Sequence, residues 1–150
     1  MKKFILAMAA LTFSFGVMSA QDLASATATY NSGAEALTMG NKTSALEYFQ
    51  KALTMAESLG EEGAEVATNC KNAIPSVILS IGKEFYNNKD FSNAKAKFVE
   101  AAEVAKKYGN DEVTAEVESL LPTVGKRIAL AKVNEAMKNK DIAGVLAGYE

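Results

Sequence analysis

Residues 33–52 read GAEALTMGNKTSALEYFQKA, and residues 82–101 repeat their pattern as GKEFYNNKDFSNAKAKFVEA. Glycine, alanine, phenylalanine and alanine return at a constant offset of 49, at the pairs Gly33/Gly82, Ala45/Ala94, Phe49/Phe98 and Ala52/Ala101. Each copy puts a glycine on one predicted helix and an alanine–aromatic–alanine stripe on the next. Small residues let two antiparallel helices approach closely, and the ring fills the space beside them. The stretch therefore predicts a helix hairpin that occurs twice.

The rest of the chain also has a helical pattern and almost no strand pattern, because alanine is abundant and apolar residues recur at steps of three and four. The expected helices span about 22–39, 43–59, 61–87, 91–108 and 110–138, and a sixth begins near Asp141. Pro75 and Pro122 fall inside the two long segments. Neither proline is flanked by glycine or by a polar turn cluster, so we expect one kinked helix in each case rather than two helices.

Turn and capping residues separate these helices. Gly60 and Gly109, again 49 apart, are expected to end helices. Ser44 and Glu47 have the spacing of a capping box, and Asp90 and Asp141 are expected to cap the helices that follow them. Tight turns between helices are expected at 39–41, 87–90 and 138–141.

The N-terminus has the pattern of a secretory signal peptide. Lys2 and Lys3 precede an apolar stretch from Phe4 to Met18, and cleavage is expected after Ala20 or after Ser19. Fifteen apolar residues are short for a membrane-spanning helix, although an uncleaved anchor is the alternative. We therefore expect residues 1–20 to be a signal peptide and the mature protein to be exported, either periplasmic or secreted, with no stable membrane anchor after cleavage.

The charge and cysteine content exclude several classes of protein. Without Lys2 and Lys3, the 16 basic residues become 14 against 18 acidic residues, a net charge of −4. An acidic chain is poorly suited to nucleic acid or to an anionic membrane surface. Cys70 is the one cysteine and cannot form an intrachain disulfide. Its register with Val66 and Ile74 favours a buried small hydrophobe, with an intermolecular disulfide or a reactive thiol as alternatives.

Catalytic motifs are missing from the sequence. It contains no histidine, which excludes the common nucleophilic triads and histidine metal sites. Gly60–Gly63 does not match a phosphate-binding loop. Glu61, Glu62 and Glu65 lie at a helix start, where the helix dipole favours acidic side chains. We expect no enzyme activity, no cofactor and no metal site within these residues.

The two copies resemble the tetratricopeptide repeat (TPR) family, whose pattern places a small residue, then alanine, an aromatic and alanine at these spacings. Ile81 and Phe85 fit the large apolar positions around the small residue in the second copy. A degenerate third copy is expected from Asp141, through Ile142 and Val145, to Tyr149. The usual TPR period is about 34 residues, whereas this chain repeats after 49. The resemblance implies an all-α array of antiparallel helix hairpins, a TPR-like α-solenoid over residues 21–150 that is truncated or continued past Glu150.

The resemblance also implies a ligand-binding face on the first helix of each hairpin. By register, this face would carry Tyr30 in the first copy and Leu79, Lys83, Tyr86 and Asn87 in the second. One stripe of this helix also carries Leu79, Lys83, Tyr86 and Asn87. It is set apart from the stripe through Ile78, Ile81 and Phe85 that is expected to face the core. Lys83 and Asn87 could together hold a carboxylate, although an ordinary solvated surface is the alternative.

These features favour a noncatalytic exported helical-repeat module that binds a protein or peptide. The alternative is the helical part of a larger envelope protein, which would bind a small ligand or carry an enzyme domain beyond Glu150.

Overall fold

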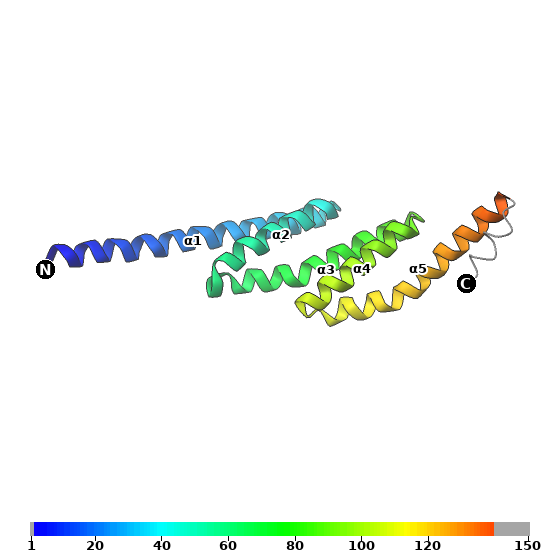
Figure 1. Ribbon diagram of the computed structural model, residues 1–150. Helices are drawn as coiled ribbons and strands as arrows, with labels where there is room; N and C mark the ends of the chain where they lie inside the picture. Colours follow the sequence, from blue (N-terminus) through cyan, green and yellow to red (C-terminus); the bar gives the residue numbers. More distant parts are fainter. Residues whose placement is uncertain (1, 140–150) are drawn as a thin grey trace. The chain divides into compact units, whose positions relative to one another are not determined.

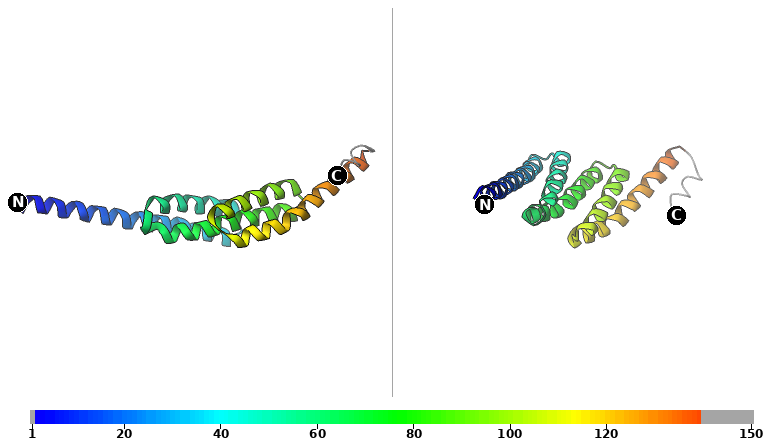
Figure 2. Two further views of the ribbon diagram at one scale, coloured as in Figure 1. Left: turned by 60° about the horizontal axis from the view of Figure 1, so that its bottom comes forward. Right: turned by 60° about the vertical axis from the view of Figure 1, so that its left-hand side comes forward.

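The computed structural model describes the backbone of residues 2–139 and the side chains of residues 20–139. This part of the chain is all-α, with no strand (Figure 1; Figure 2). Its elements are α1 (Lys2–Thr38), α2 (Lys42–Ser58), the 3₁₀ helix η1 (Gly60–Gly63), α3 (Ala64–Asn87), α4 (Phe91–Tyr108) and α5 (Asp111–Lys138). The expected all-α class and hairpin order are confirmed. The sixth helix and the third copy, from Asp141 onward, lie outside the described residues.

The chain divides into two units, Met1–Ile74 and Pro75–Glu150, and the boundary in the sequence falls inside α3. In the first unit, α1 and α2 form an antiparallel hairpin, followed by η1 and the first part of α3. Gly33 of α1 lies directly beside the ring of Phe49 from α2, so that a Cβ atom at Gly33 would be 2.8 Å from the ring. Phe49, Ala45 and Ala52 are buried. The small-residue and aromatic positions of the first copy therefore meet as predicted.

The second unit contains the last part of α3, together with α4 and α5. Gly82 repeats the role of Gly33, because a Cβ atom there would be 2.6 Å from the ring of Phe98. Phe98 is 1% exposed, and Ala94 and Ala101 on the same face of α4 are fully buried. On α5, the buried residues are Val113, Val117, Val124 and Val133. The second copy thus builds the same close contact between glycine and phenylalanine.

The buried face of α3 differs from the prediction. Ile81 and Phe85, which were expected in the core, are half-buried, while Leu79 is 3% exposed although it was expected on an open stripe. In the second unit α3 has two neighbours, since Gly82 packs on α4 and Lys83 pairs with Glu116 of α5. A helix with two neighbours can bury more than one narrow stripe. The predicted division is wrong at Leu79, Ile81 and Phe85, whereas Ile78 is buried and Lys83 and Asn87 are exposed, as predicted.

The helix ends correct the predicted capping. The side-chain oxygens of Asn41, Asp90 and Asn110 each accept a hydrogen bond from the backbone N–H three residues later, at 3.0–3.2 Å. Asp90 is therefore confirmed as a cap. The capping box from Ser44 to Glu47 is wrong, because Ser44 lies within α2 and donates its N–H to Asn41. The side-chain oxygen of Asn41, one position before the helix, accepts the hydrogen bond from the Ser44 N–H that the Glu47 side chain would have accepted in a capping box.

The C-terminal signals and the prolines behave largely as expected. Gly109 ends α4 in the left-handed conformation with φ +73°. Gly60, with φ +61°, begins the separate turn η1, which lies between α2 and α3. Pro75 and Pro122 lie inside the continuous helices α3 and α5, so neither proline divides its segment into two helices. Figure 1 shows α5 curving along its length, as expected for a helix in which proline removes a hydrogen bond.

Candidate binding pocket

The five residues of the predicted ligand-binding face have different surroundings. Tyr30 belongs to the first unit, where its ring packs on Phe49 with the ring centroids 5.2 Å apart. Leu79 is buried in the second unit. Lys83 forms an ion pair with Glu116 of α5 at 2.5 Å, with both side chains about half exposed. An exposed pair of this kind contributes only about 0–1 kcal/mol to stability, but it gives the Lys83 ammonium a partner from its own chain.

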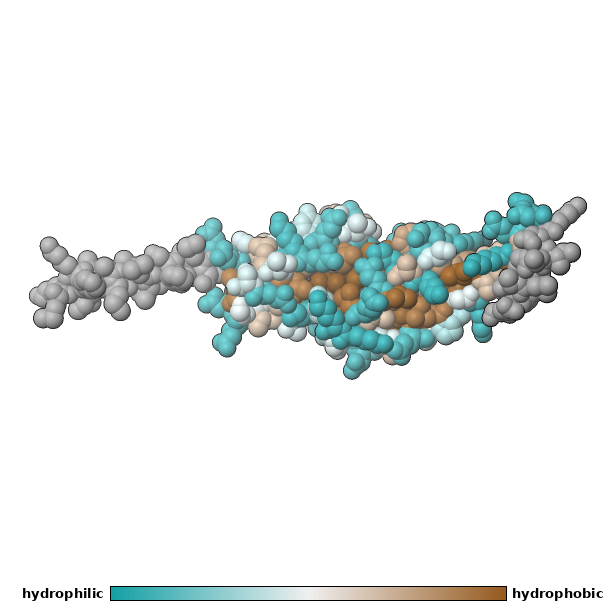
Figure 3. Space-filling view, viewed as in Figure 1, coloured by the Kyte–Doolittle hydropathy of each residue, from teal (hydrophilic) through white to brown (hydrophobic). Residues whose placement is uncertain are grey.

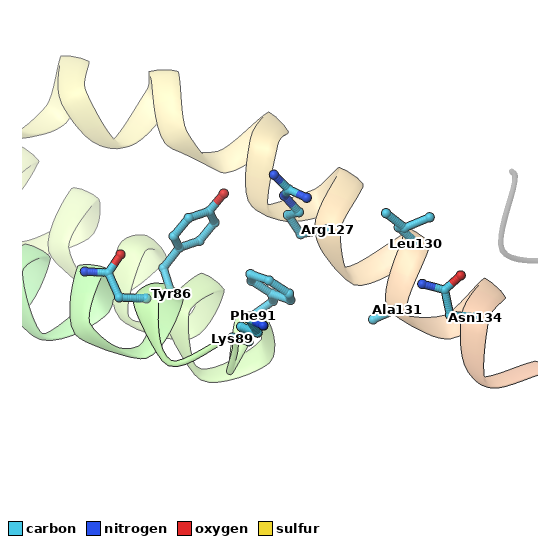
Figure 4. Close-up of a pocket in the computed structure, with 8 residues that line it drawn as sticks. Tyr86, Lys89, Phe91, Arg127, Leu130, Ala131 and Asn134 are labelled. Carbon is cyan, nitrogen blue, oxygen red and sulfur yellow. The ribbon is translucent and has the colours of Figure 1, made fainter.

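Tyr86 and Asn87 do line a hollow in the surface of the second unit, with a cavity volume of about 430 Å³ (Figure 4). We call this hollow the α3–α5 pocket. One side is formed by the end of α3 and the start of α4, with Tyr86, Asn87, Lys89 and Phe91. The other side is a stripe of α5 formed by Arg127, Leu130, Ala131 and Asn134. The pocket therefore brings together two of the five residues of the predicted ligand-binding face, Tyr86 and Asn87, and six residues that were not predicted.

Local structure positions the first side of the pocket. Asp90 caps α4 through the backbone N–H of Asn93, which makes Phe91 the first residue of the helix. The ring of Phe91 meets the ring of Tyr86 edge-on, with centroids 5.3 Å apart and an interplanar angle of 64°. Figure 4 shows both rings projecting from this end of the hairpin toward α5. Edge-to-face packing is a favourable arrangement for two aromatic rings and holds this wall of the pocket in place.

The α5 side follows from helical periodicity. Arg127, Leu130, Ala131 and Asn134 occupy positions i, i+3, i+4 and i+7, which lie on one face of a helix. Leu130 is 49% exposed although it is a large apolar residue. In Figure 3, brown hydrophobic residues appear at the surface of α5 among teal hydrophilic ones. The sequence is enough to identify this stripe as one face of a helix. It does not show that the stripe lies near Tyr86 and Phe91, because that depends on how α5 packs.

The lining of the pocket is cationic and contains no carboxylate. Lys89 and Arg127 provide two positive charges from opposite sides, and Asn87 and Asn134 provide amides. The complete chain has a formal net charge of −2, so the sign of the pocket is opposite to that of the molecule. Such a surface favours an anionic group over a cationic one.

Lys89 also has an unusual backbone. Its φ of +62° makes it the one non-glycine residue with positive φ in the described part of the chain. At the offset of 49, the corresponding residue of the first copy is Gly40, with φ +80°. The left-handed region is easily adopted by glycine and unfavourable for a residue with a Cβ atom. The second copy therefore keeps lysine where the backbone geometry favours glycine.

Cys70 is fully buried, in agreement with the predicted buried hydrophobe. Desolvation raises the pKa of its thiol from 9.0 to about 11. We expect iodoacetamide at pH 8 to modify Cys70 much more slowly in the folded protein than in urea, because the thiolate is the reactive form. Equal rates in the two conditions would contradict the buried thiol.

The same pKa shift predicts a pH dependence of stability. The unfolded thiol loses its proton near pH 9 and the folded thiol near pH 11. The contribution of Cys70 should be complete below pH 9 and be lost as the pH rises toward 11. Urea midpoints at pH 8 and pH 10 should therefore differ more in the wild type than in Cys70→Ala.

Within the described residues, no group of three or more histidine, cysteine, aspartate or glutamate side chains is placed to hold a metal ion. Within residues 20–139, no helix has the length and apolar character needed to cross a membrane. Comparisons of the chain with protein-family models, with curated proteins and with solved structures found no match in any of the three.

Proposed function

We propose that this chain is a noncatalytic helical-repeat module that binds a segment of another protein in the α3–α5 pocket. The observation that carries the proposal is the lining of the pocket, which combines two aromatic rings, two amides, two cations and the exposed Leu130. Aromatic and arginine side chains are enriched where proteins bind one another, and an amide can hydrogen-bond to a peptide backbone. The pattern of glycine, alanine and phenylalanine, present in two copies, supports a TPR-like array.

The proposal includes export. Its support is the sequence of residues 1–20, with two lysines followed by an apolar stretch that is short for a membrane span. N-terminal sequencing of protein recovered from cell-envelope fractions is expected to begin at Gln21 or Ala20. Recovery of the intact Met1 form in the cytoplasm would contradict export.

A second candidate is a small-ligand site in the helical part of a larger envelope protein. The observation that favours it is the cavity volume of about 430 Å³, which falls within the range of small-molecule pockets, about 300–1,000 Å³. The two candidates use the same surface and differ in what occupies it.

Site-specific photo-crosslinking in cells separates these candidates. A photoreactive phenylalanine analogue replaces Leu130, which lines the pocket and is 49% exposed. The matched control replaces Val99, a 39% exposed residue of α4 that does not line the pocket. We expect a discrete protein adduct from position 130 and none from position 99, and the adduct should weaken when Tyr86→Ala is added. If position 130 yields no protein adduct while native mass spectrometry shows a co-purifying small molecule, the second candidate replaces the first.

A further inference from the structure

We infer that the α3–α5 pocket selects an acidic peptide segment, in which an aspartate or glutamate adjoins an aromatic or large aliphatic residue. Lys89 and Arg127 bind the carboxylate, while Tyr86, Phe91 and Leu130 contact the neighbouring apolar side chain. The inference rests on the proposed function and specifies the chemistry of the partner. It differs from the predicted ligand-binding face, whose cation was Lys83.

The first argument is charge. Lys71, Lys83, Lys97 and Lys106 each pair with a glutamate of this chain. None of these four ion pairs, which lie among the described residues, involves Lys89 or Arg127. No carboxylate is among the residues that line the pocket. Unpaired lysines are common on surfaces, but here two cations face one hollow from two elements. A planar guanidinium can hold a carboxylate through two parallel hydrogen bonds, and an ammonium adds a third donor.

The second argument is the backbone of Lys89. Glycine would adopt φ +62° without strain, as Gly40 does at the corresponding turn. A strained residue that is held at the edge of a pocket points to a role for its side chain. In this pocket, that role is to bring an ammonium group to the side opposite Arg127 (Figure 4).

The third argument is the apolar side of the pocket. The rings of Tyr86 and Phe91 meet edge-on at 5.3 Å, and Leu130 lies across from them on α5. A free inorganic anion would leave this apolar surface in contact with water. A peptide with an acidic residue beside an apolar residue would contact both the cationic and the apolar part of the pocket. The amides of Asn87 and Asn134 could form hydrogen bonds to the peptide backbone between those two residues. The complete lining therefore fits a peptide better than a simple anion.

The test uses the full chain and an array of hexapeptides with acetylated N-termini and amidated C-termini, so that side chains carry the only carboxylates. Each peptide places aspartate or glutamate beside phenylalanine, tyrosine or leucine, and its matched partner carries asparagine or glutamine instead. Fluorescence anisotropy of the best labelled pairs should show binding about tenfold tighter for the acidic member, given the strength of charge-assisted hydrogen bonds. The difference should shrink as salt is added.

Three variants locate the binding. Arg127→Gln and Lys89→Asn should each weaken binding of the acidic peptide about tenfold, and asparagine is chosen at 89 because it tolerates the left-handed conformation. Lys95→Gln, at an exposed lysine of α4 outside the pocket, should leave binding unchanged. Circular dichroism and urea midpoints close to those of the wild type would show that the variants are folded.

Several results would overturn the inference. Equal binding of the acidic and amide peptides would remove the carboxylate preference, and unchanged binding to both pocket variants would place the site elsewhere. Binding of 3-phenylpropionate or inorganic phosphate as tightly as the best acidic peptide would reduce the pocket to a simple anion site. A crosslinked partner at position 130 that persists in Arg127→Gln would retain the proposed function while rejecting an acidic partner.

Discussion

Replacing Phe98 by alanine is expected to lower the free energy of unfolding by about 3–5 kcal/mol. The ring is 1% exposed and fills the space beside Gly82, which has no side chain to collapse into the cavity left behind. Ala94 and Ala101, on the same face of α4, are also too small to fill it. Urea denaturation followed by circular dichroism at 222 nm measures the loss.

The adjacent residue provides the control. Val99 has an exposed fraction of 39%, so Val99→Ala should lower the free energy of unfolding by less than about 1 kcal/mol. If the two substitutions have similar effects, the ring of Phe98 does not fill the core that we describe.

The second large effect is expected at Gly63, where alanine should destabilise the protein by about 3 kcal/mol or more. Gly63 ends η1 and lies against α2, so that a Cβ atom there would collide with the carbonyl oxygen of Ala56 and lie 2.9 Å from its Cα atom. A neighbouring side chain could rotate away from the new Cβ atom, but the Ala56 atoms belong to a helix backbone and cannot. Relief therefore requires that η1 and α2 separate, which places this change at the upper end of overpacking effects.

Gly125 is the matched control for Gly63. It lies inside α5, and a Cβ atom there would meet nothing within 4 Å. Gly125→Ala should therefore raise the free energy of unfolding by about 0.5–1 kcal/mol, because alanine is the better helix former. The two glycine-to-alanine substitutions should shift the urea midpoint in opposite directions. Stabilisation by Gly63→Ala would show that η1 does not pack closely on α2.

The helices and their pairing are readable from local chemistry. The offset of 49 predicts that Gly33 meets Phe49 and that Gly82 meets Phe98, because a ring beside a glycine is the arrangement that allows two helix backbones to approach. Helix propensity and the turn residues place four of the five predicted helices within about three residues of those observed. These features depend on interactions between residues that are close in sequence or one hairpin apart. Such interactions can be recognised in the sequence because the same residues recur in both copies.

The pocket depends on contacts that no local pattern encodes. The stripe of Arg127, Leu130 and Asn134 is visible in the sequence as a helical face, but the packing of α5 in the second unit is what sets it across from Tyr86 and Phe91. The same packing gives Lys83 a partner in Glu116 of α5. Residues far apart in the chain become a site through the packing angle and register of whole helices, and those are set by the summed fit of many side chains.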